Sequence, residues 1–166
     1  SVVVSSGDLI SASPLISGLF LDEPTIEVMN AIGLDLNAVG NHEFDQRRMR
    51  DASLLTRRIE TSQFRWLGGN IAFAQGSDGK PVVDSKNLAR TALVESGGIR
   101  IGIFGLTLPT VGVEYIAGFE GEQATARTLV AELRARKAEI IVALTHLSAQ
   151  DDRRLLESLG AEGPDI

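Results

Sequence analysis

The chain alternates between two patterns of apolar positions, one typical of strands and one typical of helices. Short apolar runs predict strands at residues 2–4, 34–39, 65–69, 92–95, 99–104 and 139–144. Apolar residues that return every three or four positions predict helices at residues 24–32, from residue 46 to 59, at 121–138 and at 155–159. Ser96-Gly97-Gly98 predicts a hairpin turn, and residues 74–88 predict a surface loop. This alternation predicts an α/β domain.

Predicted strands end in residues that are suited to metal-assisted chemistry. The run at 2–4 leads to Gly7-Asp8, the run at 34–39 leads to Gly40-Asn41-His42-Glu43-Phe44-Asp45, and the run at 139–144 leads to Thr145-His146. These blocks contain both histidines of the sequence. Because parallel strands bring their carboxyl ends to one edge of a sheet, we expect these side chains to meet there.

Each block has a functional interpretation and an ordinary one. A carboxylate such as Asp8 can bridge two divalent cations about 3.5 to 4 Å apart. Asp45 is placed to accept a hydrogen bond from His42, which would orient the ring as a general acid beside an anion held by helix-start N–H groups. Alternatively, Asp8, Asn41 and Asp45 are turn or cap residues, and His42 and His146 are surface or edge residues.

Taken in order, the blocks Gly7-Asp8, Gly40 to Asp45 and Thr145-His146 resemble those of the calcineurin-like metallophosphoesterases. Residues 7–15, 22–27 and 29–31 are similar to the bacterial 5′-nucleotidase branch, which includes UDP-sugar hydrolases and 2′,3′-cyclic-nucleotide phosphodiesterases. The resemblance runs over nearly the whole chain. It implies an α/β/β/α sandwich of two mixed sheets flanked by helices, with the site at the carboxyl edge of the strands.

The resemblance implies hydrolysis of nucleotides or related phosphomonoesters and diesters by a metal-activated hydroxide at a dinuclear site. It makes Asp8, Asn41 and His146 ligands of two divalent ions, which the mixed oxygen and nitrogen donors suggest are Mn, Zn, Fe or Co. His42, paired with Asp45, would stabilise or protonate the leaving oxygen. Asn41 and His42 would also bind the substrate phosphate.

Two sequence blocks of the family are missing from this sequence. Their absence bears on how much of the catalytic domain residues 1–166 contain. Members carry Asp-x-His before Gly-Asp and Gly-His-x-His or Gly-His-x-Gln after the last block, whereas this sequence has only two histidines. We therefore expect residues 1–166 to be a single domain, the incomplete central part of a metallophosphoesterase catalytic domain, without the C-terminal nucleotide-specificity domain. The parent protein is expected to be an enzyme. For this fragment the alternative is a non-catalytic scaffold with unfilled metal positions, and Glu43 is expected only to support its turn.

Composition adds limits on partners and compartment. The 166 residues carry a net charge of -6, which argues against a nucleic-acid-binding surface and leaves a small phosphoester or nucleotide as the expected partner. No apolar stretch reaches the roughly 20 residues of a membrane span. The resemblance favours a periplasmic or extracellular parent, and the sequence does not indicate an oligomeric state. A Rossmann-like nucleotide binder is disfavoured because no Gly-x-Gly-x-x-Gly or Gly-x-x-x-x-Gly-Lys loop follows a strand.

Overall fold

The first sheet of the protein is parallel, and its strands come from the amino-terminal part of the chain. The computed structural model describes residues 1–45, 52–109 and 113–166. The strands of the first sheet lie in the order β1-β2-β3-β5, and each neighbouring pair is parallel. Their bounds are β1 (Val4–Ser5), β2 (Leu36–Ala38), β3 (Arg65–Leu67) and β5 (Leu88–Ala89). β1 pairs with β2 through only two residue pairs among those described.

The second sheet is mixed and is built around its longest strand, β7. It contains β6 (Thr91–Ser96), β7 (Ile99–Thr107) and β9 (Ile140–His146), with β6 antiparallel and β9 parallel to β7. Gly97 and Gly98, with φ of 62° and 80°, form the turn of the β6–β7 hairpin. A separate antiparallel ribbon joins β4 (Ile71–Phe73) to β8 (Ile116–Phe119).

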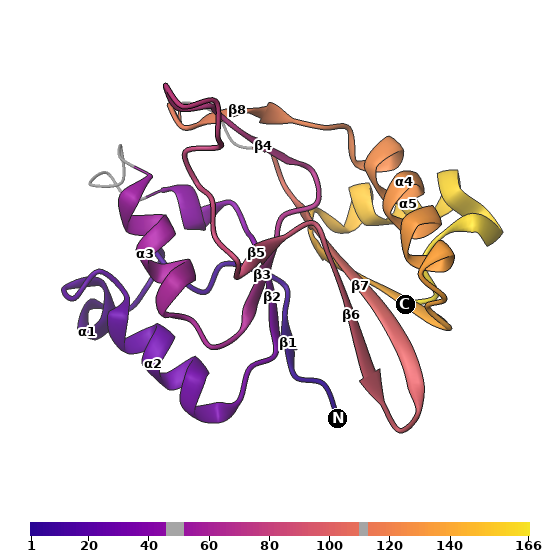
Figure 1. Cartoon of the computed structure of the whole chain (residues 1–166), viewed down its shortest axis with the longest axis horizontal. Coiled ribbons are helices and arrows are strands. Elements are labelled where there is room, and N and C mark those ends of the chain that lie inside the picture. Colours follow the sequence, from indigo (N-terminus) through magenta and orange to yellow (C-terminus); the bar gives the residue numbers. More distant parts are fainter. Residues whose placement is uncertain (46–51, 110–112) are drawn as a thin grey trace.

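Helices cover the outer face of each sheet, as Figure 1 shows. On one side lie α1 (Leu15–Gly18), α2 (Glu23–Ile32) and α3 (Ser53–Thr61), and on the other lie α4 (Glu122–Ala135) and α5 (Ala149–Leu159). Short 3-10 turns span His42–Phe44 and Gly160–Glu162. The helix, sheet, sheet, helix order confirms the predicted sandwich.

Apolar side chains fill all three spaces between these layers. The cluster between the sheets draws on both of them and consists of Leu36, Ala38, Leu67, Ala92, Ile103 and Leu144. A second cluster lies between the first sheet and α2 and α3, and includes Ile26, Leu55, Ile59 and Trp66. A third lies between the second sheet and α4 and α5, and includes Phe104, Leu129, Leu133 and Leu155. Both sheets are therefore buried on both faces.

Most of the predicted elements are confirmed, with differences at their ends. The predicted hairpin is the β6–β7 pair, and the predicted helices at 24–32, 121–138 and 155–159 correspond to α2, α4 and α5. The helix predicted from residue 46 is observed as α3 (Ser53–Thr61), and residues 46–51 lie outside the described residues. The periodicity did not predict α1, β4, β5 or β8, and β5 begins at Leu88, the last residue of the predicted loop.

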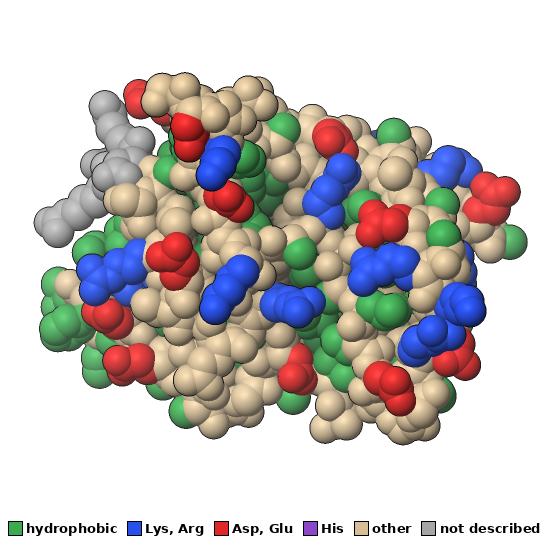
Figure 2. Space-filling model, viewed as in Figure 1, with side chains coloured by type: hydrophobic (Ala, Val, Ile, Leu, Met, Phe, Trp, Pro, Cys, Tyr) green, Lys and Arg blue, Asp and Glu red, His purple; other side chains and the backbone are tan. Residues whose placement is uncertain are grey.

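Charges of both signs are interspersed over the face of the molecule shown in Figure 2. No broad field of one sign covers that face, so an anion approaching it would meet local charges and not a general attraction. Within the described ranges, no helix has the length and apolar character needed to cross a membrane.

The sheets touch backbone to backbone at the end of β3. The N–H of Gly69 donates to the carbonyl of Gly105 in β7 at 2.9 Å. A Cβ atom added at Gly105 would lie 2.3 Å from the carbonyl oxygen of Leu67, far inside van der Waals contact. Glycine at position 105 therefore sets the spacing of the two sheets at this end.

Gly105→Ala is expected to force β3 and β7 apart and to lower the free energy of unfolding by about 3 kcal/mol or more. Gly118→Ala in β8 is the matched control, because a Cβ there meets no atom within 4 Å. Urea denaturation of the two variants and the wild type measures the difference. Equal stability of the two variants would show that the sheets do not depend on this contact.

Candidate functional site

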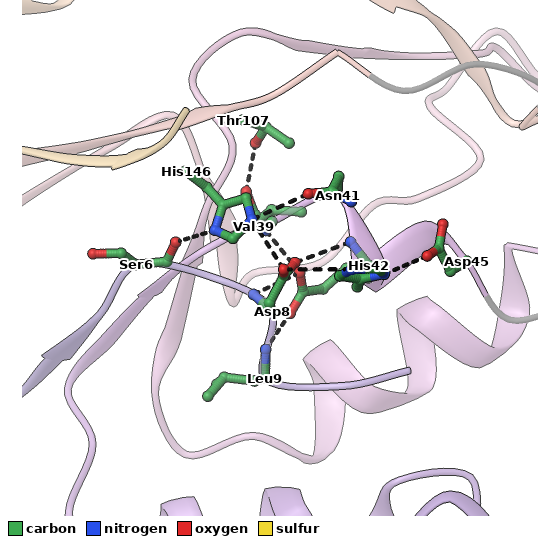
Figure 3. A network of polar contacts seen from close by, with 11 residues as sticks. Ser6, Asp8, Leu9, Val39, Asn41, His42, Asp45, Thr107 and His146 are labelled. Carbon is green, nitrogen blue, oxygen red and sulfur yellow. Dashed lines mark hydrogen bonds and ion pairs between the residues drawn. The ribbon is translucent and has the colours of Figure 1, made fainter. Parts of the chain in front are cut away.

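Residues far apart in the sequence meet at the carboxyl edge of the strands (Figure 3). Asp8 follows β1, Asn41 and His42 follow β2, and His146 ends β9. His146 Nε2 lies 3.0 Å from Asp8 Oδ2 and 3.1 Å from Asn41 Oδ1. His42 Nε2 lies 3.9 Å from the same oxygen of Asp8. The predicted meeting of these side chains is therefore present in the structure.

The loops after β1 and β2 approach one another more closely than side chains allow. Gly7 has φ of 103° and Asp8 has φ of 57°, so the first loop turns through the left-handed region. A Cβ atom on Gly40 would lie 2.3 Å from Asp8 Oδ1 and 2.6 Å from Asp8 N. Glycine at position 40 is thus required for Asp8 to reach the site.

The side chain of Glu43 links the loops after β1 and β2 to each other. Its carboxylate is buried and accepts N–H groups from Asp8 at 3.0 Å, Leu9 at 2.7 Å and Gly40 at 2.7 Å. Burial raises the pKa of Glu43 to about 7, and the three backbone N–H groups act in the opposite direction. The expected turn-supporting role of Glu43 is confirmed, and the turn it supports is shared by two segments of the chain.

His146 is oriented by the backbone of the first loop. Its Nδ1 lies 2.8 Å from the carbonyl oxygen of Ser6, and a carbonyl only accepts, so Nδ1 carries the hydrogen. In a neutral ring Nε2 then presents a lone pair, and it faces the oxygens of Asp8 and Asn41, which also present lone pairs. A cation placed between these electron donors would be stabilised by all three of them.

The donor set fits a divalent metal ion in part. Carboxylate oxygen, amide oxygen and imidazole nitrogen all bind such ions, and ligand atoms about 2.1 Å from one ion lie roughly 3.0 to 3.4 Å apart. The 3.0 and 3.1 Å separations around His146 Nε2 agree with that spacing. Over residues 1–45, 52–109 and 113–166, however, no group of three or more His, Cys, Asp or Glu side chains is placed to hold a metal. These three donor atoms are too few for a complete coordination sphere.

His42 and Asp45 form a pair beside this donor set. His42 Nδ1 contacts the carboxylate of Asp45 within hydrogen-bond distance, and both side chains are partly exposed. The hydrogen bond to Asp45 is the largest effect on His42 and raises its pKa above the ordinary value, while slight burial lowers it and the charge of Asp8 raises it further. Asp45 therefore favours the protonated form of His42, whose ring is partly exposed to solvent.

The helix-start amides expected to bind an anion are largely used by the protein itself. His42 N donates to Asp8 Oδ1 at 3.0 Å, Phe44 N to the carbonyl of Asn41 and Asp45 N to the carbonyl of His42. The reason is that a 3-10 turn, not an α-helix, follows Asn41, and that Asp8 folds over its start. Those amides are accordingly not available as a phosphate cradle.

Two buried residues near the site were not assigned to it from the sequence. Asn70 is buried and bonds through its side chain to both backbone groups of Thr107. Thr107 was missed, although it is a polar residue at a strand end, like His146. The sequence signal was present, but hydroxyl groups at strand ends are too common to single one out.

Comparison with known proteins found relatives that are named as nucleotidases and phosphodiesterases. No protein-family model matches the chain. The chain is 31% identical over 153 residues to the 5′-nucleotidase of Vibrio cholerae, covering 88% of this chain and 26% of that protein. It covers less than half of the length of the curated relatives it matches.

Solved structures of related proteins are similar to this chain in fold. The 5′-nucleotidase precursor of Thermus thermophilus matches with a TM-score of 0.76 and 25% identity over 93% of this chain and 29% of that chain. The calcineurin-like phosphoesterase YfkN of Bacillus subtilis matches in fold, with a TM-score of 0.68 and 21% identity over 89% of this chain and 48% of that chain. The resemblance drawn from the motifs is confirmed.

Asp45→Asn is expected to lower the pKa of His42, because the substitution removes the charged acceptor that is the largest cause of the raised value. The His42 titration can be followed by NMR of its ring in metal-free protein. Asp78→Asn, at an exposed carboxylate in the loop at 74–88, is the matched control. An unchanged titration of His42 in the Asp45 variant would contradict the pairing.

Proposed function

We propose that this chain, a relative of the 5′-nucleotidases, carries part of the active site of a divalent-metal phosphohydrolase. The observation that supports this best is the meeting of Asp8, Asn41, His42 and His146 at one edge of the fold. They come from the ends of β1, β2 and β9, and one oxygen of Asp8 and one of Asn41 lie 3.0 and 3.1 Å from His146 Nε2. Chance placement of surface residues does not produce such convergence.

Asp8, Asn41 and His146 would hold the metal, with Mn, Zn, Fe or Co suited to this mixture of donors. When bound, divalent ions bring the pKa of a water molecule toward about 7 and neutralise charge on phosphoryl oxygens. A dinuclear centre with Asp8 as the bridge is part of the proposal, and it needs ligands beyond these three. We therefore assign the activity to a longer protein in which residues 1–166 are the central part of the catalytic domain.

His42 supplies acid chemistry in this proposal. Asp45 holds Nδ1, which leaves Nε2 on the side of the ring that faces Asp8. A proton on Nε2 can pass to the oxygen of the leaving group as the bond to phosphorus breaks, and Asp45 stabilises the ring while it is charged. The side chains of Asn41 and His42 are placed to contact the phosphate, a role that the backbone amides of this turn do not take.

The proposed substrates are nucleotides or related phosphoesters. Relatives of this chain are named as a 5′-nucleotidase of Vibrio cholerae and as a 2′,3′-cyclic-nucleotide 2′-phosphodiesterase/3′-nucleotidase of Yersinia enterocolitica. These names span phosphomonoesters and cyclic diesters. A small phosphoester is thus the expected partner.

The longer protein that contains residues 1–166 is expected to hydrolyse p-nitrophenyl phosphate, its bis ester or AMP when Mn²⁺ or Zn²⁺ is added. His42→Ala should lower kcat about 10²- to 10⁴-fold, as for loss of a general acid. Asp8→Asn should remove most metal-dependent activity, and asparagine tolerates the left-handed backbone at this position, so the fold is retained. Release of p-nitrophenol or phosphate measures each rate.

Asp78→Asn, which changes an exposed aspartate by the same single atom, should keep the wild-type rate. Hydrolysis that is insensitive to both the His42 and the Asp8 substitutions would rule out this site as its source.

A second function is favoured by the lack of a complete metal group among the described residues. In that case the chain is a scaffold that keeps the fold without a competent centre. Elemental analysis after soaking in Zn²⁺ and desalting separates the two. The phosphohydrolase site is expected to retain close to one ion per chain and to lose it in His146→Ala, whereas a scaffold would retain much less than one and show no difference between the two proteins.

A further inference from the structure

Thr107, the last residue of β7, is fully buried and bonds to the strand that leads into the site. Its Oγ1 donates to the carbonyl of Val39 at 2.6 Å (Figure 3). Val39 immediately precedes Gly40-Asn41. The hydroxyl of Thr107 therefore fixes the exit of β2, two residues before Asn41.

Asn70 holds the backbone of Thr107 in place. Asn70 Nδ2 donates to the carbonyl of Thr107 at 2.8 Å, and Thr107 N donates to Asn70 Oδ1 at 2.9 Å. Asn70 is itself fully buried, so both bonds are shielded from competing water. The two bonds fix the peptide groups on both sides of Thr107 and hence the direction of its hydroxyl.

Thr107 is also the neighbour of His146. In the parallel β7–β9 pair, Thr107 is in register with His146, and Leu108 N donates to the carbonyl of His146 at 2.9 Å. β2 belongs to the first sheet and β9 to the second, so the contact of Asn41 Oδ1 with His146 Nε2 crosses from one sheet to the other. Thr107 is therefore hydrogen-bonded to the segment that leads to Asn41, and it lies beside His146 in the second sheet.

We propose that Thr107 is a positioning residue whose hydroxyl sets the separation of Asn41 and His146, with Asn70 holding its backbone. The consequence for metal binding rests on the proposed function, whereas the consequence for the placement of His146 does not. A threonine that only filled space could be exchanged for valine, which has the same shape, without any effect on either side chain.

The test compares Thr107→Val, which deletes the hydroxyl, with Thr107→Ser, which retains it. Thr107→Val should shift the ring ¹⁵N and ¹H resonances of His146 in metal-free protein and should weaken Zn²⁺ binding about 10- to 100-fold in calorimetry, the range for loss of an outer partner of a metal ligand. Thr107→Ser should return both measurements toward wild type. Thr125→Val is the matched control, since Thr125 is buried in α4 and donates to Glu120 at 3.3 Å.

Should Thr107→Val not fold, Asn70→Asp serves in its place, because it keeps the acceptor for Thr107 N and loses the donor to the Thr107 carbonyl. It should shift the same His146 resonances. Absence of Zn²⁺ binding by the wild type would count against the proposed function alone, and the His146 resonances would still decide the positioning role. Unchanged resonances in Thr107→Val, failure of Thr107→Ser to restore them, or an equal shift in Thr125→Val would overturn the proposal.

Discussion

The bonds from the Glu43 carboxylate to the backbone of two loops are the interaction on which the site depends most. Among the described residues, the β1–β2 ladder has two residue pairs, Val4 with Leu36 and Ser5 with Asn37, and it ends before the loop that carries Asp8. Beyond that short pairing, Glu43 binds N–H groups on both sides of the junction. Removing the Glu43 carboxylate would leave those backbone N–H groups without their acceptor in a largely buried environment. The position of Asp8 is thus set by a side chain 35 residues away.

The site is divided between two layers, and this division links its geometry to the core. Asp8 and Asn41 follow strands of the first sheet, and His146 ends a strand of the second. Any change in the spacing of the sheets moves these groups relative to one another. The close backbone contact at Gly105 and the hydroxyl of Thr107 both lie where the sheets meet. The residues that set the spacing of the sheets therefore also set the geometry of the candidate site.

The sequence was sufficient for most of the elements and for most of the site residues at the strand ends, and insufficient for the bonds between them. Periodicity reports which side chains share a face, so it located α4 and the β6–β7 hairpin. The run at residues 34–39 predicted β2, yet it did not show that Asn37 is buried there with neither side-chain polar atom bonded, because helices cover the outer face of the sheet as well. The roles of Glu43 and Thr107 depend on backbone groups brought near by the fold, which no local pattern records.

The left-handed backbone at Asp8 narrows the mutational tolerance of this position. Of the common residues, glycine, asparagine and aspartate adopt that conformation at low cost, and only aspartate among them offers a carboxylate. Glutamate and histidine can also coordinate cations, but glutamate is poorly suited to this backbone, and histidine would bring a bulky ring into the narrow space beside Gly40. Substitution at residue 8 is therefore limited by the backbone conformation and by the space beside Gly40 before the chemistry of the side chain is considered.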